Sequence, residues 1–320
     1  VYYATSRELK ARMRPAELMW QYAWGFIATG QGLLATIAVG VVTVVVLITL
    51  GVIGRLRLRW LAALCLTAAA LVAGIALLFA WAHTHRDMTA PGEIYGTARG
   101  GLYYGTCLVN IPPNHVRGRL ETPYSVFSID ILPDREKHVL LLDVEPIDEP
   151  DVFFEDLRAR IDESEGREAV LFIHGYNVSF EDAAGRTAQL GVDLGIDRSP
   201  LAPIMYSWPS QADFLWYSID SNNTEFAAMK LEEFLRRIAA RADARKVHLV
   251  AHSMGNRVLT KALMRMNDPI TRSDDTIFRE VVLTAPDVDT RDFEDRIADE
   301  ILNGFLRFTL YASSNDEVLK

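Results

Sequence analysis

The feature that most constrains this chain is a serine at the point where an apolar strand would turn directly into a helix. The apolar run at residues 247–250 leads into Ala251, His252, Ser253, Met254 and Gly255, and residues 256–266 then carry apolar side chains at helical spacing. This order is typical of a nucleophile elbow, in which small residues two positions before and after the serine let the turn close. An ordinary turn is the alternative. The order of strand, turn and helix favours the elbow and predicts that Ser253 is exposed above a sheet edge.

Two long uncharged stretches lie near the start of the chain. Residues 18–54 and 60–82 contain no charged side chain, and Arg55, Arg57 and Arg59 lie between them. A bilayer-spanning helix needs about 20 apolar residues, so each stretch is long enough to cross a membrane. We therefore predict a transmembrane helical hairpin at residues 31–82, with spans at 31–53 and 60–82. The alternative, a hairpin buried in a soluble protein, would need a large protein shell around helices that are apolar on every side.

The predicted spans divide the chain into four parts. Residues 1–30 are expected to form an N-terminal and interfacial segment, residues 31–82 the hairpin, residues 83–95 a linker, and residues 96–320 a folded domain. Basic residues lie both before the first span and in the tight loop, so the positive-inside rule gives two conflicting orientations. The charges in the loop lie next to both spans. We therefore expect the loop in the cytoplasm and the domain on the extracytoplasmic side.

Charge is distributed unevenly along the chain. The net charge is −9, but residues 1–99 hold 9 Lys/Arg and 4 Asp/Glu, so the remainder carries a charge near −14. An acidic domain repels polyanions, and the chain has no glycine loop of the phosphate-binding type, so nucleic-acid binding is disfavoured. Cys65 lies in a predicted span and Cys107 outside it, which argues against a disulfide between them. His83 and His85 do not make a metal site by themselves, and we expect no metal or organic cofactor.

Beyond residue 96, strand-like and helix-like patterns alternate, which predicts an α/β fold with a mainly parallel sheet. Residues 91–123 contain glycines, prolines and tyrosines that suggest turns and short antiparallel strands. The clearest helical pattern covers residues 225–242, with Leu231, Phe234, Leu235 and Ile238 on one face. The expected strands are residues 125–131, 138–144, 169–174, 203–207, 246–251, 280–285 and 307–312.

Several short motifs occur in a fixed order around these strands. Residues 172–177 read Phe-Ile-His-Gly-Tyr-Asn, residues 206–210 read Tyr-Ser-Trp-Pro-Ser, and the Ser253 elbow follows. Further motifs are Arg99-Gly100, Tyr104-Gly105, Ala-Pro-Asp-Val-Asp at 285–289 and Tyr-Ala-Ser-Ser-Asn-Asp at 311–316. Together they resemble an uncharacterised bacterial α/β-hydrolase family, similar from about residue 96 to the end. The resemblance implies an α/β-hydrolase fold and serine hydrolysis at a bacterial inner membrane, but no particular ester.

Serine hydrolysis needs donors for the oxyanion, a base and an acid. The backbone N–H of Met254 is one expected oxyanion donor, and the second is expected in the loop after residues 169–174, at Tyr176. Gly175 lets this loop turn closely, and His174 and Ala251 support the loop and the elbow. Asp316 is our choice for the acid because it follows a late strand, as the order Ser, Asp, His of this fold requires. Asp287 and Asp289 are the alternatives, and each could instead cap a helix.

The general base is missing from the chain order Ser, Asp, His, because His252 is the last histidine in the sequence. His252 directly precedes Ser253, so its side chain should project to the other side of the strand as a packed histidine. His174 belongs on the oxyanion side and is a weak candidate for the base. We expect that the native polypeptide continues beyond Lys320 and supplies a histidine after one more strand.

The sequence therefore predicts a membrane-anchored serine hydrolase that cleaves a carboxylic ester or thioester through an acyl-enzyme on Ser253. Its substrate is expected to be a small-molecule or lipid ester. Trp208, Tyr217 and Asp220 follow a strand on the active-site side and are candidates for an acyl pocket, with core packing as the alternative. The rival hypothesis is a catalytically inactive scaffold of the same fold, or a subunit of a membrane complex.

Overall fold

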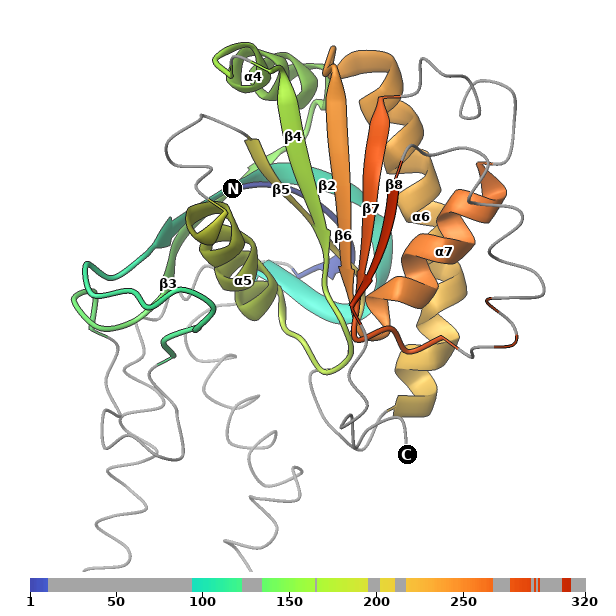
Figure 1. The fold of residues 1–320 in the computed structure, drawn as a ribbon, viewed down its shortest axis with the longest axis horizontal. Coiled ribbons are helices and arrows are strands. Elements are labelled where there is room, and N and C mark those ends of the chain that lie inside the picture. Colours follow the sequence, from blue (N-terminus) through green and yellow to red (C-terminus); the bar gives the residue numbers. More distant parts are fainter. Residues whose placement is uncertain are drawn as a thin grey trace, which may run out of the picture. The chain divides into compact units, whose positions relative to one another are not determined.

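The computed structural model describes residues 1–10, 94–122, 134–164, 166–194, 202–210, 217–266, 277–288, 291, 293 and 307–311. These residues form an eight-stranded sheet in the order β3-β2-β1-β5-β4-β6-β7-β8 (Figure 1). The strands are β1 Tyr2–Leu9, β2 Tyr95–Asn110, β3 Leu140–Ile147, β4 Glu168–Ile173, β5 Ala202–Ser207, β6 Lys246–His252, β7 Phe278–Thr284 and β8 Arg307–Tyr311.

Most of the sheet is parallel, as the alternating pattern predicts. Strands β1, β5, β4, β6, β7 and β8 all pair in parallel with their neighbours. The antiparallel pairs are β1 with β2 and β2 with β3. The carboxyl ends of the parallel strands therefore meet at one edge, which is where ligands bind in sheets of this kind.

The first strand corrects the expected domain boundaries. Residues 1–30 were expected outside the folded domain, yet β1 lies inside the sheet between β2 and β5. Residues 1–10 and 91–320 form one compact unit, and residues 11–90 form another. The hydrolase-like domain therefore includes residues 1–10, and residues 11–90 are an insertion between two of its paired strands. Distance along the sequence concealed this, because the pairing partner of β1 lies some 90 residues away.

Helices cover the sheet on both faces because neighbouring strand residues point to opposite sides. Tyr3 and Met205 lie in one apolar cluster, and Ala4 and Ile204 lie in the other. Helix α5 (Phe180–Asp193) packs in the cluster with Tyr3, whereas α4 (Pro150–Asp162), α6 (Tyr217–Arg241) and α7 (Gly255–Arg265) contribute to the cluster with Ala4. Helices α6 and α7 run side by side (Figure 1).

The apolar spacing of α7 shows why this segment forms a helix at this place. Val258, Leu259, Ala262 and Leu263 recur at helical spacing and are almost entirely buried. Burial of each large aliphatic side chain contributes about 1.5–3 kcal/mol, so this face fixes the helix against the sheet. The helix begins directly after the elbow and therefore holds Ser253 at its N-terminal end.

Two glycines in β2 allow backbones to approach closely. A Cβ on Gly100 would lie 2.4 Å from the carbonyl oxygen of Arg7, and one on Gly105 would lie 2.2 Å from that of Glu145. Residues 91–123 were expected to contain short strands. Instead, residues 95–110 form a single 16-residue strand that pairs on both sides, and the glycines make this possible.

Most expected strands match the observed ones to within three residues. The expected strand at 125–131 lies outside the described residues, and so do the predicted spans at 31–53 and 60–82. Within the described part of the chain, no helix has the length and apolar character that crossing a membrane requires.

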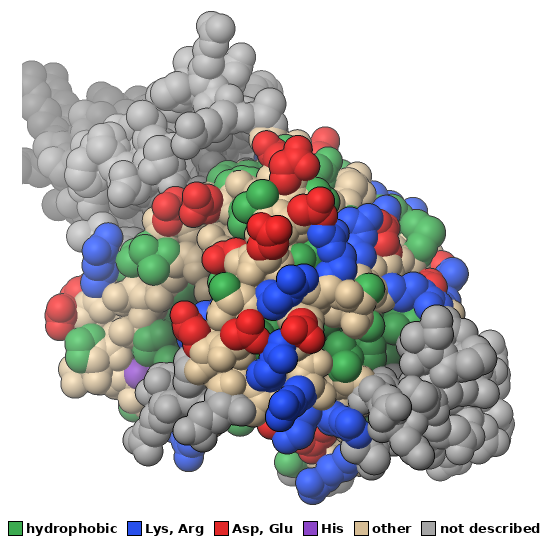
Figure 2. Space-filling view, turned by 90° about the horizontal axis from the view of Figure 1, so that it is seen from above, with side chains coloured by type: hydrophobic (Ala, Val, Ile, Leu, Met, Phe, Trp, Pro, Cys, Tyr) green, Lys and Arg blue, Asp and Glu red, His purple; other side chains and the backbone are tan. Residues whose placement is uncertain are grey.

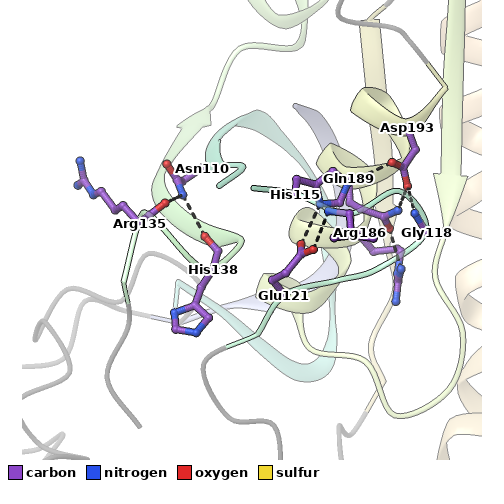
Figure 3. Close-up of polar contacts among 10 residues, drawn as sticks. Asn110, His115, Gly118, Glu121, Arg135, His138, Arg186, Gln189 and Asp193 are labelled. Carbon is purple, nitrogen blue, oxygen red and sulfur yellow. Dashed lines mark hydrogen bonds and ion pairs between the residues drawn. The ribbon is translucent and has the colours of Figure 1, made fainter. Parts of the chain in front are cut away.

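A polar cluster fastens the loop after β2 to the end of α5 (Figure 3). The Nδ1 of His115 lies 2.8 Å from a carboxylate oxygen of Glu121, and its Nε2 lies 3.0 Å from a carboxylate oxygen of Asp193. Asp193 also accepts hydrogen bonds from Gln189 and from the backbone N–H of Gly118. Burial alone would lower the pKa of His115, but the bonds to Glu121 and Asp193 outweigh it and raise that pKa.

Candidate active site

Ser253 occupies a strained turn between β6 and α7. Its φ is +51°, which lies in the left-handed region that non-glycine residues rarely adopt. Its backbone N–H donates to the carbonyl oxygen of Thr284 on β7 at 3.0 Å, and its side chain is partly exposed. Strain of this kind costs about 1–3 kcal/mol and is concentrated at functional sites. The turn lies at the lower edge of the sheet in Figure 1, where β6 ends and α7 begins.

Small residues hold the elbow closed, as the spacing requires. A Cβ on Gly255 would lie 2.4 Å from the carbonyl oxygen of His174, so a larger residue would push α7 away from β4. Ala251 is completely buried beneath the turn. Asn256, which the sequence analysis did not single out, is also buried, and its Nδ2 donates to the carbonyl oxygens of Ser253 at 2.8 Å and Thr284 at 3.0 Å. The only sequence signal for this role was an asparagine in the first turn of the helix that follows the elbow.

The loop after β4 packs directly against the nucleophile. A Cβ on Gly175 would lie 2.8 Å from the Cβ of Ser253 and 2.9 Å from the carbonyl oxygen of His252. Only glycine lets the loop approach so closely, and Tyr176 follows in the same loop. Met254 lies at the N-terminal cap of α7, where backbone N–H groups carry partial positive charge. Gly175 and Met254 therefore both lie beside Ser253.

His174 is locked in place by its neighbours and supports the loop. The backbone N–H of Trp208 can only donate, and it lies 3.1 Å from Nε2 of His174, so this nitrogen is unprotonated. The proton is then on Nδ1, which donates to the carbonyl oxygen of Gly175 at 2.8 Å. Burial, and then the charge of Arg7, lower the pKa of His174 to about 3. Both ring nitrogens are engaged, so His174 is a poor candidate for the general base.

Trp208 lies in the core under this loop. Its indole stacks on the imidazole of His174 at a centroid distance of 5.3 Å, and its Nε1 donates to the carbonyl oxygen of His174 at 2.7 Å. The side chain is fully buried. For Trp208, the structure therefore favours core packing over the alternative of an exposed acyl pocket.

Arg7 of β1 is a buried charge that the sequence analysis did not identify. Its guanidinium donates to Oγ of Ser207 and to the carbonyl oxygens of Gly96, Ser210 and Val178, at 2.7–3.3 Å. It also lies 3.4 Å from Nε2 of His174. A single side chain thus ties the ends of β1 and β5 to the loop that carries Gly175. An isolated arginine in an N-terminal segment gave no signal for this role.

One candidate acid, Asp287, lies in the loop after β7. Its backbone N–H donates to the carbonyl oxygen of Ser253 at 3.3 Å, so the loop is close to the elbow. Its carboxylate accepts a hydrogen bond from Nη2 of Arg257 on α7 at 2.8 Å. This ion pair gives Asp287 a role in holding the loop to α7. Asp289 and Asp316 lie outside the described residues.

The prediction for His252 was wrong. It was expected to pack on the far side of the strand, but its side chain is exposed. β6 ends at this residue; Thr284 of β7 still pairs with it, but β4 ends one position earlier, at Ile173. A Cβ on Gly175 would lie 3.0 Å from its Nδ1, which places the imidazole beside the loop. Tyr217 and Asp220 belong to the first turn of α6, and their side chains lie outside the description.

The described residues offer little for a metal or a thiol chemistry. Among them, no group of three His, Cys, Asp or Glu side chains is arranged to hold a metal ion. Cys107 is buried in β2, and burial raises the pKa of its thiol to about 12. A thiol with this pKa is protonated and unreactive at neutral pH.

A strained serine between a parallel strand and a helix, facing a glycine loop at the carboxyl edge of the sheet, defines the class of α/β hydrolases. A family model described as "Alpha/beta hydrolase of unknown function (DUF900)" matches residues 150–320, which is more than half of the chain. The protein belongs to this family. The search of curated proteins found no match to the chain. Strands β1, β2 and β3 precede the matched residues.

Proposed function

We propose that the protein is a serine hydrolase that cleaves a carboxylic ester or thioester through an acyl-enzyme on Ser253. Oγ of Ser253 would attack the acyl carbonyl, and the alcohol or thiol would leave with a proton. Water would then release the carboxylic acid and restore the serine. Backbone N–H groups at Met254 and in the loop of Gly175 would stabilise the negative charge on the carbonyl oxygen in both steps.

The observation that carries this proposal is the pairing of two unusual backbone features. Ser253 adopts a positive φ and its side chain is partly exposed at the sheet edge, and Gly175 approaches its Cβ more closely than any other residue type could. Neither feature is needed to close an ordinary turn between a strand and a helix. Together they support a shared role of the Ser253 hydroxyl and the loop of Gly175 in one site.

The base and acid of the triad remain predictions from the sequence. His174 is engaged at both nitrogens, and His248 lies near the start of β6, with Nε2 3.3 Å from a carboxylate oxygen of Glu168. Asp316 as the acid is consistent with the order of the fold, in which the acid follows a late strand. The ion pair of Asp287 with Arg257 supports the choice of Asp316 over Asp287.

We also propose that the hydrolase is anchored in a bacterial inner membrane by residues 31–53 and 60–82. The support is the absence of charge in both stretches. The domain would lie on the extracytoplasmic side, with the arginines of the tight loop in the cytoplasm. Arg7 is buried in the sheet and so does not belong to the basic N-terminal group that argues for the opposite orientation.

Labelling with a fluorophosphonate probe tests the catalytic proposal on the full polypeptide. We expect covalent labelling that Ser253→Ala abolishes. Ser179→Ala is the matched control, because Ser179 is an N-cap at the start of α5, and this variant should label like the parent. Labelling that persists in Ser253→Ala would overturn the proposal. A folded protein that does not label at all would favour the inactive scaffold.

A further inference from the structure

We propose that the substrate of this site is an amphiphilic acyl ester carried by a membrane, because the chain leaves the domain for its apolar insertion at the catalytic edge of the sheet. This inference rests on the proposed hydrolase activity of Ser253. It adds the class of substrate and the route by which the substrate arrives. The argument uses the positions of β1 and β2, which the structure describes.

The insertion leaves and re-enters the domain at one point. Leu9 at the end of β1 pairs with Tyr95 at the start of β2. The backbone N–H of Lys10 donates to the carbonyl oxygen of Ile94 at 2.8 Å. Both connections to the intervening residues therefore start on the same side of the domain. A chain that leaves and returns at one point must cross a membrane an even number of times, and the two predicted spans satisfy this condition.

This point lies on the same edge as the nucleophile. Ala4, Tyr206, Ile173 and Ala251 form one row across β1, β5, β4 and β6. All four strands run in the same direction, so the residues that follow each of them lie beyond the row at the same edge. Ser253 is two residues past its place in the row, and Lys10 is six residues past its own. Three strand spacings, or about 14 Å, separate β1 from β6 along the sheet.

The connections to the predicted spans are short. Residues 83–93 link the second span to β2, and an extended chain covers at most about 3.6 Å per residue. Eleven residues therefore reach at most about 40 Å. In the anchored protein that we propose, Ile94 at the start of this edge would lie no farther than this from the end of the second span.

The opposite edge of the domain carries several charged pairs. It carries the ion pairs Arg167 with Asp162, Arg160 with Glu163 and Lys246 with Glu168, all partly exposed. Figure 2 looks onto this edge and shows acidic and basic side chains gathered across it. Such an edge is stable in water. At the catalytic edge, Leu9 is 43% exposed next to the junction.

A membrane-borne ester suits a catalytic site that lies close to a membrane. Each CH₂ group added to an acyl chain raises its partition into a bilayer about fourfold, so a long-chain ester is concentrated at the membrane surface. The reaction is the one proposed above: the serine ester forms, the alcohol leaves with a proton, and water then releases the fatty acid. No oxidant, reductant or further reactant is required.

The test compares two esters on the full polypeptide in phosphatidylcholine vesicles. One is a water-soluble p-nitrophenyl butanoate, and the other is a membrane-borne p-nitrophenyl dodecanoate. In the test variant, flexible Gly/Ser spacers of equal length are inserted after Lys10 and before Ile94, which lets the catalytic edge move away from the membrane. The matched control has the same spacer in the exposed turn between Arg135 and Glu136.

We expect the junction spacers to lower turnover of the dodecanoate at least tenfold and to change turnover of the butanoate less than twofold. The control spacer should change neither rate. Equal loss of both rates, or no loss of either, would overturn the membrane inference while leaving the hydrolase proposal intact. If neither ester is cleaved and the fluorophosphonate probe does not label Ser253, the hydrolase proposal itself fails, and this inference fails with it.

Discussion

Lys10 and Ile94 are hydrogen-bonded to each other although 83 residues separate them in the sequence. They close the ladder between β1 and β2 in the manner of residues that flank a hairpin turn. The insertion between them is therefore replaceable in principle by a short turn. Residues 2–9 are therefore a strand of the catalytic domain and not an N-terminal tail.

We predict that replacing residues 11–93 with Asn-Gly gives a soluble, folded domain. A two-residue type I′ turn suits an antiparallel pair of this kind, and no described strand is lost. A chain that starts at residue 96 lacks β1, which lies between β2 and β5, and should aggregate. Circular dichroism and size-exclusion chromatography check both. Equal folding of the two chains would show that β1 is not needed.

Gly175→Ala should impair acylation without unfolding the protein. The new Cβ would lie 2.8 Å from that of Ser253, so the loop has to move away from the nucleophile. A misplaced oxyanion donor costs about 10²-fold in rate. Gly191→Ala in α5 is the control, because its Cβ would meet Pro203 at an ordinary 3.7 Å. The measurement is the rate of fluorophosphonate labelling. The same rate in both variants would contradict the role of Gly175.

Ser253→Gly should make the domain more stable than Ser253→Ala does. Alanine at a φ of +51° retains the strain, whereas glycine adopts this conformation freely. We expect a difference of about 1 kcal/mol in the free energy of unfolding. Thermal or urea unfolding followed by tryptophan fluorescence measures it. If the alanine variant is as stable as the glycine variant, the elbow is not strained.

Arg7→Met should destabilise the domain by roughly 2–4 kcal/mol. The substitution leaves the buried carbonyl oxygens of Ser210 and Val178 without the donor that the guanidinium provides. Arg7→Lys should lose less stability than Arg7→Met, because the lysine ammonium keeps the charge but has fewer hydrogen-bond donors than the guanidinium. Arg160→Met, which removes a surface pair with Glu163, should change stability by no more than about 1 kcal/mol. Urea unfolding compares the three variants, and equal effects of Arg7→Met and Arg160→Met would contradict the prediction.

The cluster around His115 should contribute to stability over a limited range of pH. The pKa of His115 is raised in the folded state. Its contribution to stability is therefore complete below about pH 6.5 and is lost as the pH rises through the pKa of the folded state. Burial alone would raise the pKa values of Glu121 and Asp193, but hydrogen bonds outweigh it and lower them, so their contribution is lost on acidification below about pH 4.5.

We therefore expect His115→Gln to destabilise the protein most between about pH 4.5 and 6.5, by roughly 1–3 kcal/mol. The difference from the parent should shrink at higher pH, where neutral imidazole no longer bonds to both carboxylates as a donor. Urea unfolding of the two proteins across this range measures the difference. A difference that does not change with pH would show that the cluster holds no protonated histidine.

The strands that carry the site were predictable from the sequence because they are buried runs followed by glycine or small residues. The turn at Ser253 and the loop at Gly175 both follow such strands. The membership of β1 in the sheet could not be predicted in this way. Its residues read Tyr-Tyr-Ala-Thr-Ser-Arg-Glu-Leu, without a regular alternation of apolar and polar side chains, and a strand assignment there depends on a partner beyond the insertion.

The exposure of His252 could not be predicted from the sequence either. Alternation along a strand predicts which face a side chain points to, but it does not show where the neighbouring strands stop. Because β6 ends at His252, the rule that buries alternate residues no longer applies there. Trp208 shows the reverse case: its position after a strand suggested a pocket, and the ring stacking with His174 placed it in the core.

The sequence by itself determined the local chemistry: a serine between small residues, a glycine loop, and a mainly parallel order of strands. These follow from short-range sterics and from the periodicity of apolar residues. Only the tertiary structure decided that the first ten residues complete the sheet, that Arg7 ties three segments under the site, and that the insertion leaves from the catalytic edge. Those relationships join residues far apart in the chain, and pairing over such distances is set by the packing of the whole domain.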